Sequence, residues 1–278
     1  MDMIGIMFRG MAMGITEVVP GVSGSTVAMI LGIYDRLVYS LSILTTNKRK
    51  EAIPFLSIFG LGMAIGFVSA LFVIDFLLTN YRTPTLMFFV GIIIGFLPYL
   101  WKEALYQSKG YFELKHYSII GISFCVVIIG QFIGDINNFD VNNLSIIDYM
   151  FLVSAGFIAS IALVLPGISG ALILTILGIY EIASDSLMTL RFPIIFAIFL
   201  GIFLGVLLTS RLIRYFLKNH FLETYSVMIG LVGGSIFAIL NNLNGVVNSQ
   251  IIIISTISLI AGITLVLILK QNQSNSIG

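Results

Sequence analysis

Two nearly matching segments interrupt a chain that is otherwise strongly apolar. They read VVPGVSGSTV at residues 18–27 and VLPGISGALI at residues 164–173. Proline and glycine interrupt helices, and the serine and threonine hydroxyls need hydrogen-bond partners. Inside a membrane, such irregular backbone is tolerated only where protein buries it or where it lines a wet cavity. The two segments therefore restrict the chain to folds that hold two broken helices in a protected interior.

The composition places this interior in a membrane. Hydrophobic residues make up 58% of the 278 residues and charged residues only 10%, whereas a soluble domain carries about 25% charged residues. Six apolar stretches are long enough to cross a bilayer as helices. They are approximately 53–79, 84–101, 117–134, 194–217, 225–241 and 250–270. We expect an all-α integral membrane protein with one transmembrane domain, residues 1–278, and no nucleic-acid partner, because the net charge is only +1.

The arms of each Pro-Gly segment are about ten residues long, which predicts a re-entrant hairpin. Ten helical residues reach about 15 Å, half of a hydrocarbon core of about 30 Å. With two such hairpins and a cytoplasmic N-terminus, twelve of the fourteen lysine and arginine residues lie inside, and only Arg82 and Arg191 lie outside. If each segment crosses once instead, the split is six against eight. The positive-inside rule favours the hairpins and places both termini in the cytoplasm, although the arm before Pro166, counted from Tyr149, is long enough to almost cross.

The two halves of the sequence are predicted to form an inverted-topology repeat. Residues 10–35 and 156–181 share twelve identical positions of 26 at an offset of 146, and the match continues downstream at an offset of 139. Each half holds one hairpin and three spans, so the second half enters the membrane from the opposite side, as in many secondary transporters. Glycines four apart in the spans are typical of close helix packing in lipid. The predicted repeats are 1–134, with a hairpin at about 9–35, and 147–270, with a hairpin at about 155–181.

The two tips are expected to meet near the middle of the membrane and to bind an anion. A helix begins after each tip, at about Ser25 and Ala171, and a helix N-terminus offers free N–H groups and a partial positive charge. Hydroxyl groups add donors, and glycine lets a ligand approach the backbone. Alternatively, Ser25 and Thr26 only cap their own helix. The candidate residues are Pro20, Gly21, Ser23, Gly24, Ser25 and Thr26 in the first tip and Pro166, Gly167, Ser169 and Gly170 in the second.

Three charged residues extend this candidate site. Glu17 lies three positions before Pro20 in an apolar arm, where a carboxylate is costly and indicates a function. It is expected to be protonated, to pair with a distant arginine or to carry a coupling proton, whereas Leu163 occupies its repeat position. Arg82 and Arg191 are expected either to bind an anionic headgroup at the outer face or to snorkel to lipid phosphates.

The other polar residues near the spans are interpreted as topology determinants or interface anchors and not as ligands. They are Arg211 and Arg214, Tyr34 and Tyr180, and His116 and His220. The single cysteine, Cys125, lies in an apolar run, which excludes disulfides and thiolate metal sites. We therefore predict no metal site, no catalytic residue and no cofactor.

The segments GITEVVPGVSGSTVAMILGIYDRLV and LPGISGALILTILGIYE resemble a bacterial membrane family described as polyprenyl-phosphate transporters, and the likeness covers nearly the whole chain. The resemblance implies that the substrate is undecaprenyl phosphate, a lipid carrier left in the outer leaflet after cell-wall precursors are delivered. It also implies a multi-pass protein of the plasma membrane that returns this lipid to the cytoplasmic leaflet. GITEVVPGVSGS is similar to a segment of the undecaprenyl-diphosphate phosphatases as well. Those enzymes place a histidine after the first tip and an arginine within the second, and this sequence has neither.

Three functions therefore remain open at this point. The first is a translocase that holds a lipid phosphate between the tips, the second is a lipid pyrophosphatase, and the third is a transporter for a small soluble anion. We expect the first, with polyprenyl phosphate and the bilayer as the partners. Coupling to protons or sodium ions through Glu17 is a further hypothesis, and the sequence does not set the oligomeric state.

Overall fold

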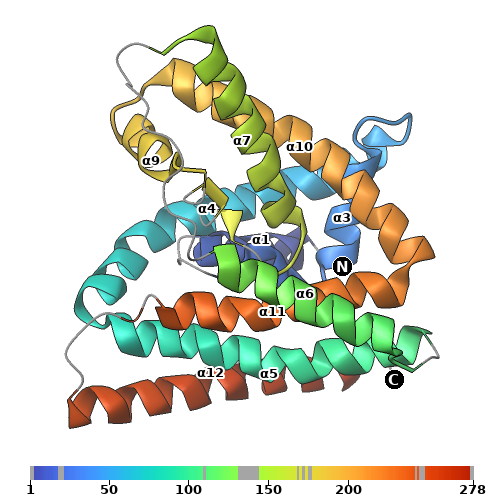
Figure 1. The fold of residues 1–278 in the computed structure, drawn as a ribbon, viewed down its shortest axis with the longest axis vertical. Helices are drawn as coiled ribbons and strands as arrows, with labels where there is room; N and C mark the ends of the chain where they lie inside the picture. The colour runs from blue at the N-terminus through green and yellow to red at the C-terminus, as the bar shows by residue number, and fades with distance from the viewer. Residues whose placement is uncertain are drawn as a thin grey trace.

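The computed structural model describes residues 3–17, 22–108, 111–130, 144–167, 169–170, 173–174, 177–241, 243 and 248–275, and within these ranges every regular element is a helix (Figure 1). The first half of the chain contains α1 (Met3–Glu17), α2 (Gly24–Ile30), α3 (Tyr34–Ile43), α4 (Arg49–Asn80), α5 (Arg82–Ser108) and α6 (Leu114–Gly130). The second half contains α7 (Ile146–Val164), α9 (Tyr180–Met188), α10 (Phe192–Asn219), α11 (Phe221–Asn241) and α12 (Ser249–Asn275). The predicted all-α class is confirmed.

Six of the described helices, α4, α5, α7, α10, α11 and α12, are long and apolar enough to cross a membrane. The integral membrane class is thus confirmed, but two helices differ from the predicted spans. The described part of the predicted span 117–134 is α6, which has only 17 residues. Conversely, α7 has 19 residues, because Ser145 and Asp148 form a capping box that starts the helix well before residue 155. Of the two arm lengths considered for the segment before Pro166, the structure therefore contains the longer one.

The chain breaks a second time shortly after the first tip. The predicted second arm of about ten residues is only the seven-residue α2, and the chain then bends by 119° into α3. Gly32, with φ of 67°, occupies the turn. Arg9 on α1 donates from Nε to the carbonyl oxygen of Leu31 at 3.1 Å, at the C-terminal end of α2, where a cation is favourable. The short helix is thus fixed at its far end by α1.

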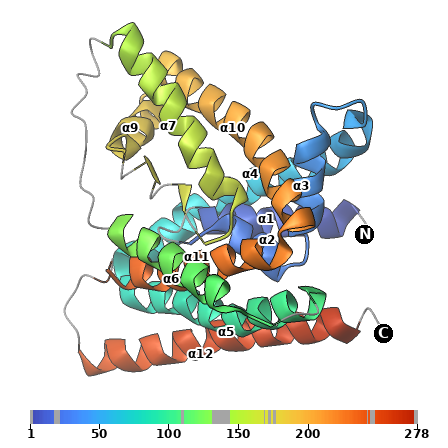
Figure 2. The ribbon, with the colours of Figure 1, turned by 45° about the vertical axis from the view of Figure 1, so that its right-hand side comes forward.

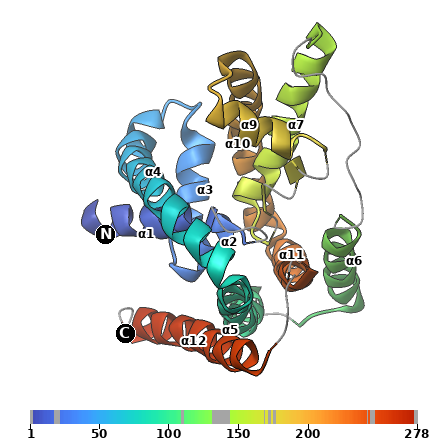
Figure 3. The same ribbon diagram turned by 90° about the vertical axis from the view of Figure 1, so that its left-hand side faces the viewer.

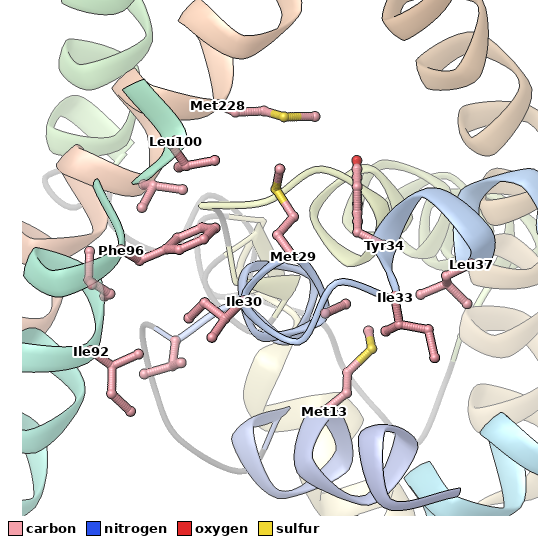
Figure 4. Close-up of a cluster of buried hydrophobic side chains, with 14 of the residues drawn as sticks. Met13, Met29, Ile30, Ile33, Tyr34, Leu37, Ile92, Phe96, Leu100 and Met228 are labelled. Carbon is pink, nitrogen blue, oxygen red and sulfur yellow. The ribbon is translucent and has the colours of Figure 1, made fainter. Parts of the chain in front are cut away.

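Helix α2 lies in the middle of the largest buried cluster. All seven of its residues are buried. Figure 4 shows Met29 and Ile30 of α2 among side chains that come from α1, α5 and α11, including Met13, Phe96 and Met228. Because protein surrounds this helix, its polar groups do not face lipid. This placement is what allows hydroxyl groups at the start of α2.

One helix pair in the first half packs in the same way as its counterpart in the second half. Helix α1 lies along α4, and α7 lies along α10. A Cβ at Gly62 of α4 would collide with the carbonyl of Met7 on α1, and a Cβ at Gly201 of α10 would collide with the carbonyl of Val153 on α7. Gly201 is the repeat partner of Gly62, and Val153 is the repeat partner of Met7, so the two contacts are equivalent. The predicted packing role of the spaced glycines is confirmed here.

The last helix of each half packs against the other half. Helix α12 lies along α5, and α6 lies along α11 (Figures 2 and 3). Gly91 on α5 meets the carbonyl of Leu259 on α12, and its repeat partner Gly230 on α11 meets the carbonyl of Ile120 on α6. The two halves are therefore interlocked by exchanged helices. The contacts follow the offsets of the sequence repeat, while the opposite orientation of the halves in a membrane stays a prediction.

Candidate functional site

The two tips contact each other directly. The Gly167 amide donates a hydrogen bond to Thr26 Oγ1 at 3.1 Å, and both groups are buried. Nearby, the Tyr34 hydroxyl donates to the carbonyl oxygen of Val164 at 3.0 Å. Two bonds thus join the α2–α3 segment to the end of α7, as expected for tips that meet. Their depth in the membrane stays a prediction.

The carboxyl group of Glu17 lies against the backbone of Gly24 at the start of α2. A Cβ at Gly24 would collide with Glu17 Oε1 and with the side chain of Met13, so only glycine permits this close approach. Among the described residues, no ion pair joins Glu17 to an arginine. An acidic side chain thus occupies the helix end that the sequence predicts to hold an anion.

The hydroxyl groups of the first tip do not cap α2. Ser23 is the N-cap residue, but its side chain makes no capping bond; its Oγ lies 2.8 Å from Ser25 Oγ instead. Its backbone carbonyl accepts from the amides of Thr26 at 3.0 Å and Val27 at 3.4 Å. Since Thr26 Oγ1 serves the second tip, the alternative that Ser25 and Thr26 only cap their helix is wrong.

The second tip requires glycine for a different reason. Gly167 has φ of +98°, a conformation that residues with a side chain rarely adopt. A Cβ there would also collide with the backbone of Leu231 and Val232 on α11. Pro166 and Ser169 on either side are buried. The tip is therefore held between α2 and α11.

Gly170 occupies the repeat position of Gly24 but has more space. A Cβ at Gly170 would meet the Ala159 carbonyl and the Leu163 side chain at 3.8 Å, an ordinary contact. Ala159 and Leu163 are the repeat partners of Met13 and Glu17, so the neighbours correspond while the carboxylate is missing. The other predicted tip residues, Pro20 and Gly21, and the helix start at Ala171 lie outside the described residues.

The two arginines that the sequence predicts to lie outside are at the starts of α10 and α5. Arg191 is the N-cap residue of α10, and its Nη2 is 3.7 Å from Asp185 Oδ2 on α9, in a solvent-exposed pair. Arg82 is partly buried at the start of α5, between Tyr81 and Pro84, which both line a cavity. The structure thus brings Glu17, Ser23, Gly24, Ser25, Thr26 and Gly167 together, and it places Arg191 against α9.

Tyr34 and His116 are not interface residues, contrary to the prediction. Tyr34 is 3% exposed because its hydroxyl reaches the end of α7, whereas Tyr180 at its repeat position is 44% exposed. His116 is also buried, since its Nδ1 accepts from the Glu113 amide at 2.9 Å and its ring packs edge-on against Phe112. The sequence signal for Tyr34, a tyrosine in the repeated GIY motif, does not distinguish the two positions.

Two arginines of α10 hold this helix against α3. Arg211 Nε donates to the Ser42 carbonyl at 3.4 Å, and Arg214 Nη1 donates to Ser42 Oγ at 3.0 Å. The Arg214 guanidinium also lies 4.3 Å from the centre of the Tyr39 ring. The sequence interpretation as topology determinants missed this contact between the halves. Its only signal was the spacing of three residues, which places both side chains on one helix face.

The chain matches the model of a family described as undecaprenyl phosphate translocase-like (VCA0040-like) over residues 13–251. It belongs to this family. A polyprenyl-phosphate transporter of Staphylococcus aureus (strain NCTC 8325 / PS 47) is 36% identical over 280 residues, which cover 95% of this chain and 96% of the relative. A polyprenyl-phosphate transporter of Vibrio cholerae serotype O1 (strain ATCC 39315 / El Tor Inaba N16961) is 26% identical over 254 residues, 85% of this chain and 77% of the relative. No solved structure matches.

The family resemblance predicted from the tip motifs is thereby confirmed. Both relatives are named as transporters and not as enzymes.

Proposed function

We propose that this protein is a translocase that returns undecaprenyl phosphate from the outer to the cytoplasmic leaflet of the bacterial plasma membrane. The names of the family and of its relatives support a polyprenyl phosphate as the substrate. Six helices that are long enough to cross a bilayer support a multi-pass membrane protein. The phosphate binds between the two tips, and the prenyl tail extends into the lipid between helices.

The observation that carries this proposal is the close approach of the Glu17 carboxyl group to Gly24 at the start of α2. A carboxyl oxygen thus already occupies the start of this helix, two residues from Thr26, which contacts the second tip. Phosphate oxygens accept hydrogen bonds as carboxylate oxygens do, and they carry more charge. We infer that the lipid phosphate displaces the Glu17 carboxylate and takes over the Gly24 amide, with the Ser23 and Ser25 hydroxyls as further donors.

Displacement of Glu17 provides a route to ion coupling. Two anions at one buried site repel each other strongly, because the surroundings screen them poorly. When the phosphate enters, Glu17 must turn away or become neutral by taking up a proton. A protonated Glu17 donates its O–H to a phosphate oxygen, so that one proton travels with each lipid. A sodium ion beside the carboxylate would meet the same electrostatic requirement.

From the contact between α3 and α10 we infer which motion transport requires. Under the predicted topology, Ser42, Arg211 and Arg214 lie near the cytoplasmic face, so their contact closes the site on that side. In transporters built from inverted repeats, one repeat rocks against the other around a fixed site. Release of the lipid to the cytoplasmic leaflet therefore needs this contact to open.

The test is a flipping assay in liposomes that contain the purified full chain. Labelled undecaprenyl phosphate is incorporated, and the fraction in the outer leaflet is followed with a reagent that does not cross the membrane, with and without a pH gradient. We expect movement well above that of protein-free liposomes, and faster movement with a proton gradient in the direction of transport. A rate equal to that of protein-free liposomes contradicts the proposal.

Two parallel measurements separate the alternative functions. Release of inorganic phosphate from undecaprenyl diphosphate would identify a pyrophosphatase. Uptake of labelled inorganic phosphate into the same liposomes would identify a carrier of small soluble anions.

A further inference from the structure

Two apolar cavities of nearly equal size lie on either side of the tips. The first, about 590 Å³, is bounded by α1, α2, α4, α5 and α12. The second, about 580 Å³, is bounded by α6, α7, α10 and α11. Both have the size of a ligand pocket, about 300–1,000 Å³. Neither is explained by a headgroup site at the tips.

The two cavities occupy equivalent places in the internal repeat. Residues of one cavity have their repeat partners in the wall of the other, on three different pairs of helices. Examples are Ile15 and Ile161, Ile74 and Ile213, and Thr85 and Thr224. Two pockets of matched size and matched lining indicate two copies of one binding site.

Each cavity reaches one of the tips. Thr16, which precedes Glu17, and Val27, which follows Thr26, line the first cavity. Leu165, two residues before Gly167, lines the second. A ligand whose anionic end sits at the tips would therefore have an apolar seat for the adjoining chain on either side.

Charged side chains lie beside lining residues of both cavities. At the first cavity, Arg82 follows the lining residue Tyr81. At the second, Lys115 Nζ lies 3.3 Å from Oε1 of the lining residue Glu223 and 3.5 Å from Glu113 Oε2, so this lysine is paired with two carboxylates. Charged groups at the mouth of an apolar pocket favour a ligand whose polar end stays at the rim while its apolar chain is buried. Under the predicted topology, the first rim faces the outer leaflet and the second faces the cytoplasmic leaflet.

We propose that both cavities bind the isoprenoid chain of the lipid phosphate, the first before and the second after the headgroup crosses between the tips. This inference rests on the proposed function and adds the tail site to it. Each cavity holds only the part of the chain next to the phosphate, and the remainder lies in the bilayer. Two binding sites of equal size give the bound lipid a similar free energy before and after the headgroup crosses, so that neither state traps it.

The experiment fills each cavity separately. Ser258 in the first cavity and Ile119 in the second are repeat partners on the exchanged helices α12 and α6, and each is replaced by tryptophan. The matched controls are Ile253→Trp on α12 and Ile122→Trp on α6, whose side chains are 59% and 66% exposed and do not line the cavities. Affinity for undecaprenyl phosphate and for the short geranyl phosphate is measured with the full chain in lipid nanodiscs.

We expect the unchanged protein to bind the long lipid at least about tenfold more tightly, since burial of two further methylenes already has this effect. Ser258→Trp and Ile119→Trp should each reduce that preference severalfold, because the long chain fills more of the cavity than the two isoprene units of geranyl phosphate do, whereas the controls keep both affinities. Retained geranyl phosphate binding shows that the variants are folded.

Each contrary result is specific. If the unchanged protein binds neither prenyl phosphate, the proposed function itself is wrong. If it binds both and the two cavity variants keep the full preference for the long chain, the tail site is wrong while the function stands. If a diacyl phosphatidic acid competes as well as undecaprenyl phosphate and loses affinity in the same variants, the cavities hold ordinary acyl chains, and the isoprenoid assignment is overturned.

Discussion

The two tips share a sequence motif and a fold position, but the acidic Glu17 of the first is replaced by Leu163 in the second. At the first tip, Gly24 is pressed against Glu17 and Met13. At the second, Gly170 meets Leu163 and the Ala159 carbonyl only at 3.8 Å. The same glycine position is thus tightly packed against an acidic side chain in the first tip and has space for a Cβ in the second.

This difference shows that the two halves contribute different chemical groups to the candidate site. The first half supplies the carboxylate, the hydroxyl groups and the short α2, while the second supplies the Gly167 amide and a rigid support against α11. The halves also differ where they touch. Arg211 and Arg214 of α10 hold α3, but within the described residues α4 makes no comparable contact with α9. The proposed transport cycle has two states, each closed on one side of the site. A structure with a contact on one side and none on the other matches one of these states.

The largest expected effect comes from Gly167→Val. The side chain would be forced into a positive φ and into the α11 backbone, a loss of about 3 kcal/mol or more. We expect little folded protein and no transport, measured by thermal unfolding of the detergent-solubilised chain and by the flipping assay. Gly170→Ala, where a Cβ finds space, should fold and transport as before. Equal behaviour of the two variants would contradict the tight packing of the second tip.

Glu17→Gln sharpens the comparison at the charged position. The amide keeps the shape and fits the same space beside Gly24, so folding should change little. Transport should fall at least about tenfold, because a hydrogen bond to a charged group is worth about 1.5–3 kcal/mol and the coupling proton is lost. Leu163→Met at the repeat position should leave transport near its normal rate. If Glu17→Gln keeps the normal rate at every pH while expression holds, the coupling hypothesis is wrong.

Thr26→Val breaks the link between the tips without changing its shape. The buried Gly167 amide then loses its acceptor, which costs about 1–3 kcal/mol. We expect a lower melting temperature and slower flipping, while Thr26→Ser keeps the oxygen and should remain close to the unchanged protein. A valine variant as stable as the serine variant would show that the link does not matter.

The smallest effect distinguishes the two repeated tyrosines. Tyr34→Phe removes the hydroxyl that donates to Val164, a loss of about 0.5–1.5 kcal/mol. Tyr180→Phe alters a side chain that is 44% exposed and should have no measurable effect on stability. The two melting temperatures, compared in one detergent, test whether the buried position alone carries a bond.

The membrane class, the broken helices and the repeat register could all be predicted from the sequence, because apolar length and helix breakers act locally. The choice of helix partners could not. Gly62 and Gly91 each have a second glycine four residues on, yet Gly62 meets α1 of its own half and Gly91 meets α12 of the other. The spacing shows that a helix face is open to close packing, but it carries no information about which helix arrives there.

The candidate site was predictable in the same partial way. The motif predicted that Glu17, Thr26 and Gly167 belong to one site, because a carboxylate and broken backbone are costly in lipid. The structure brings the three residues together, while their binding of an anion stays a prediction. The motif did not show that the Glu17 side chain lies against Gly24, since a contact between the end of α1 and the start of α2 depends on the tertiary structure. Nor did it show that Tyr34 is buried, because its twin Tyr180 follows an identical motif.

The exchanged packing of α6 and α12 has a consequence for biosynthesis. The glycine face of α5 is made early, but the helix that covers it, α12, is made after all the other described helices. Until then, α5 must keep this face against lipid or a chaperone, and the first half cannot mature alone. Loss of α12 would therefore damage packing in the first half, far away in sequence, and quality control would detect it as incomplete assembly of the whole protein.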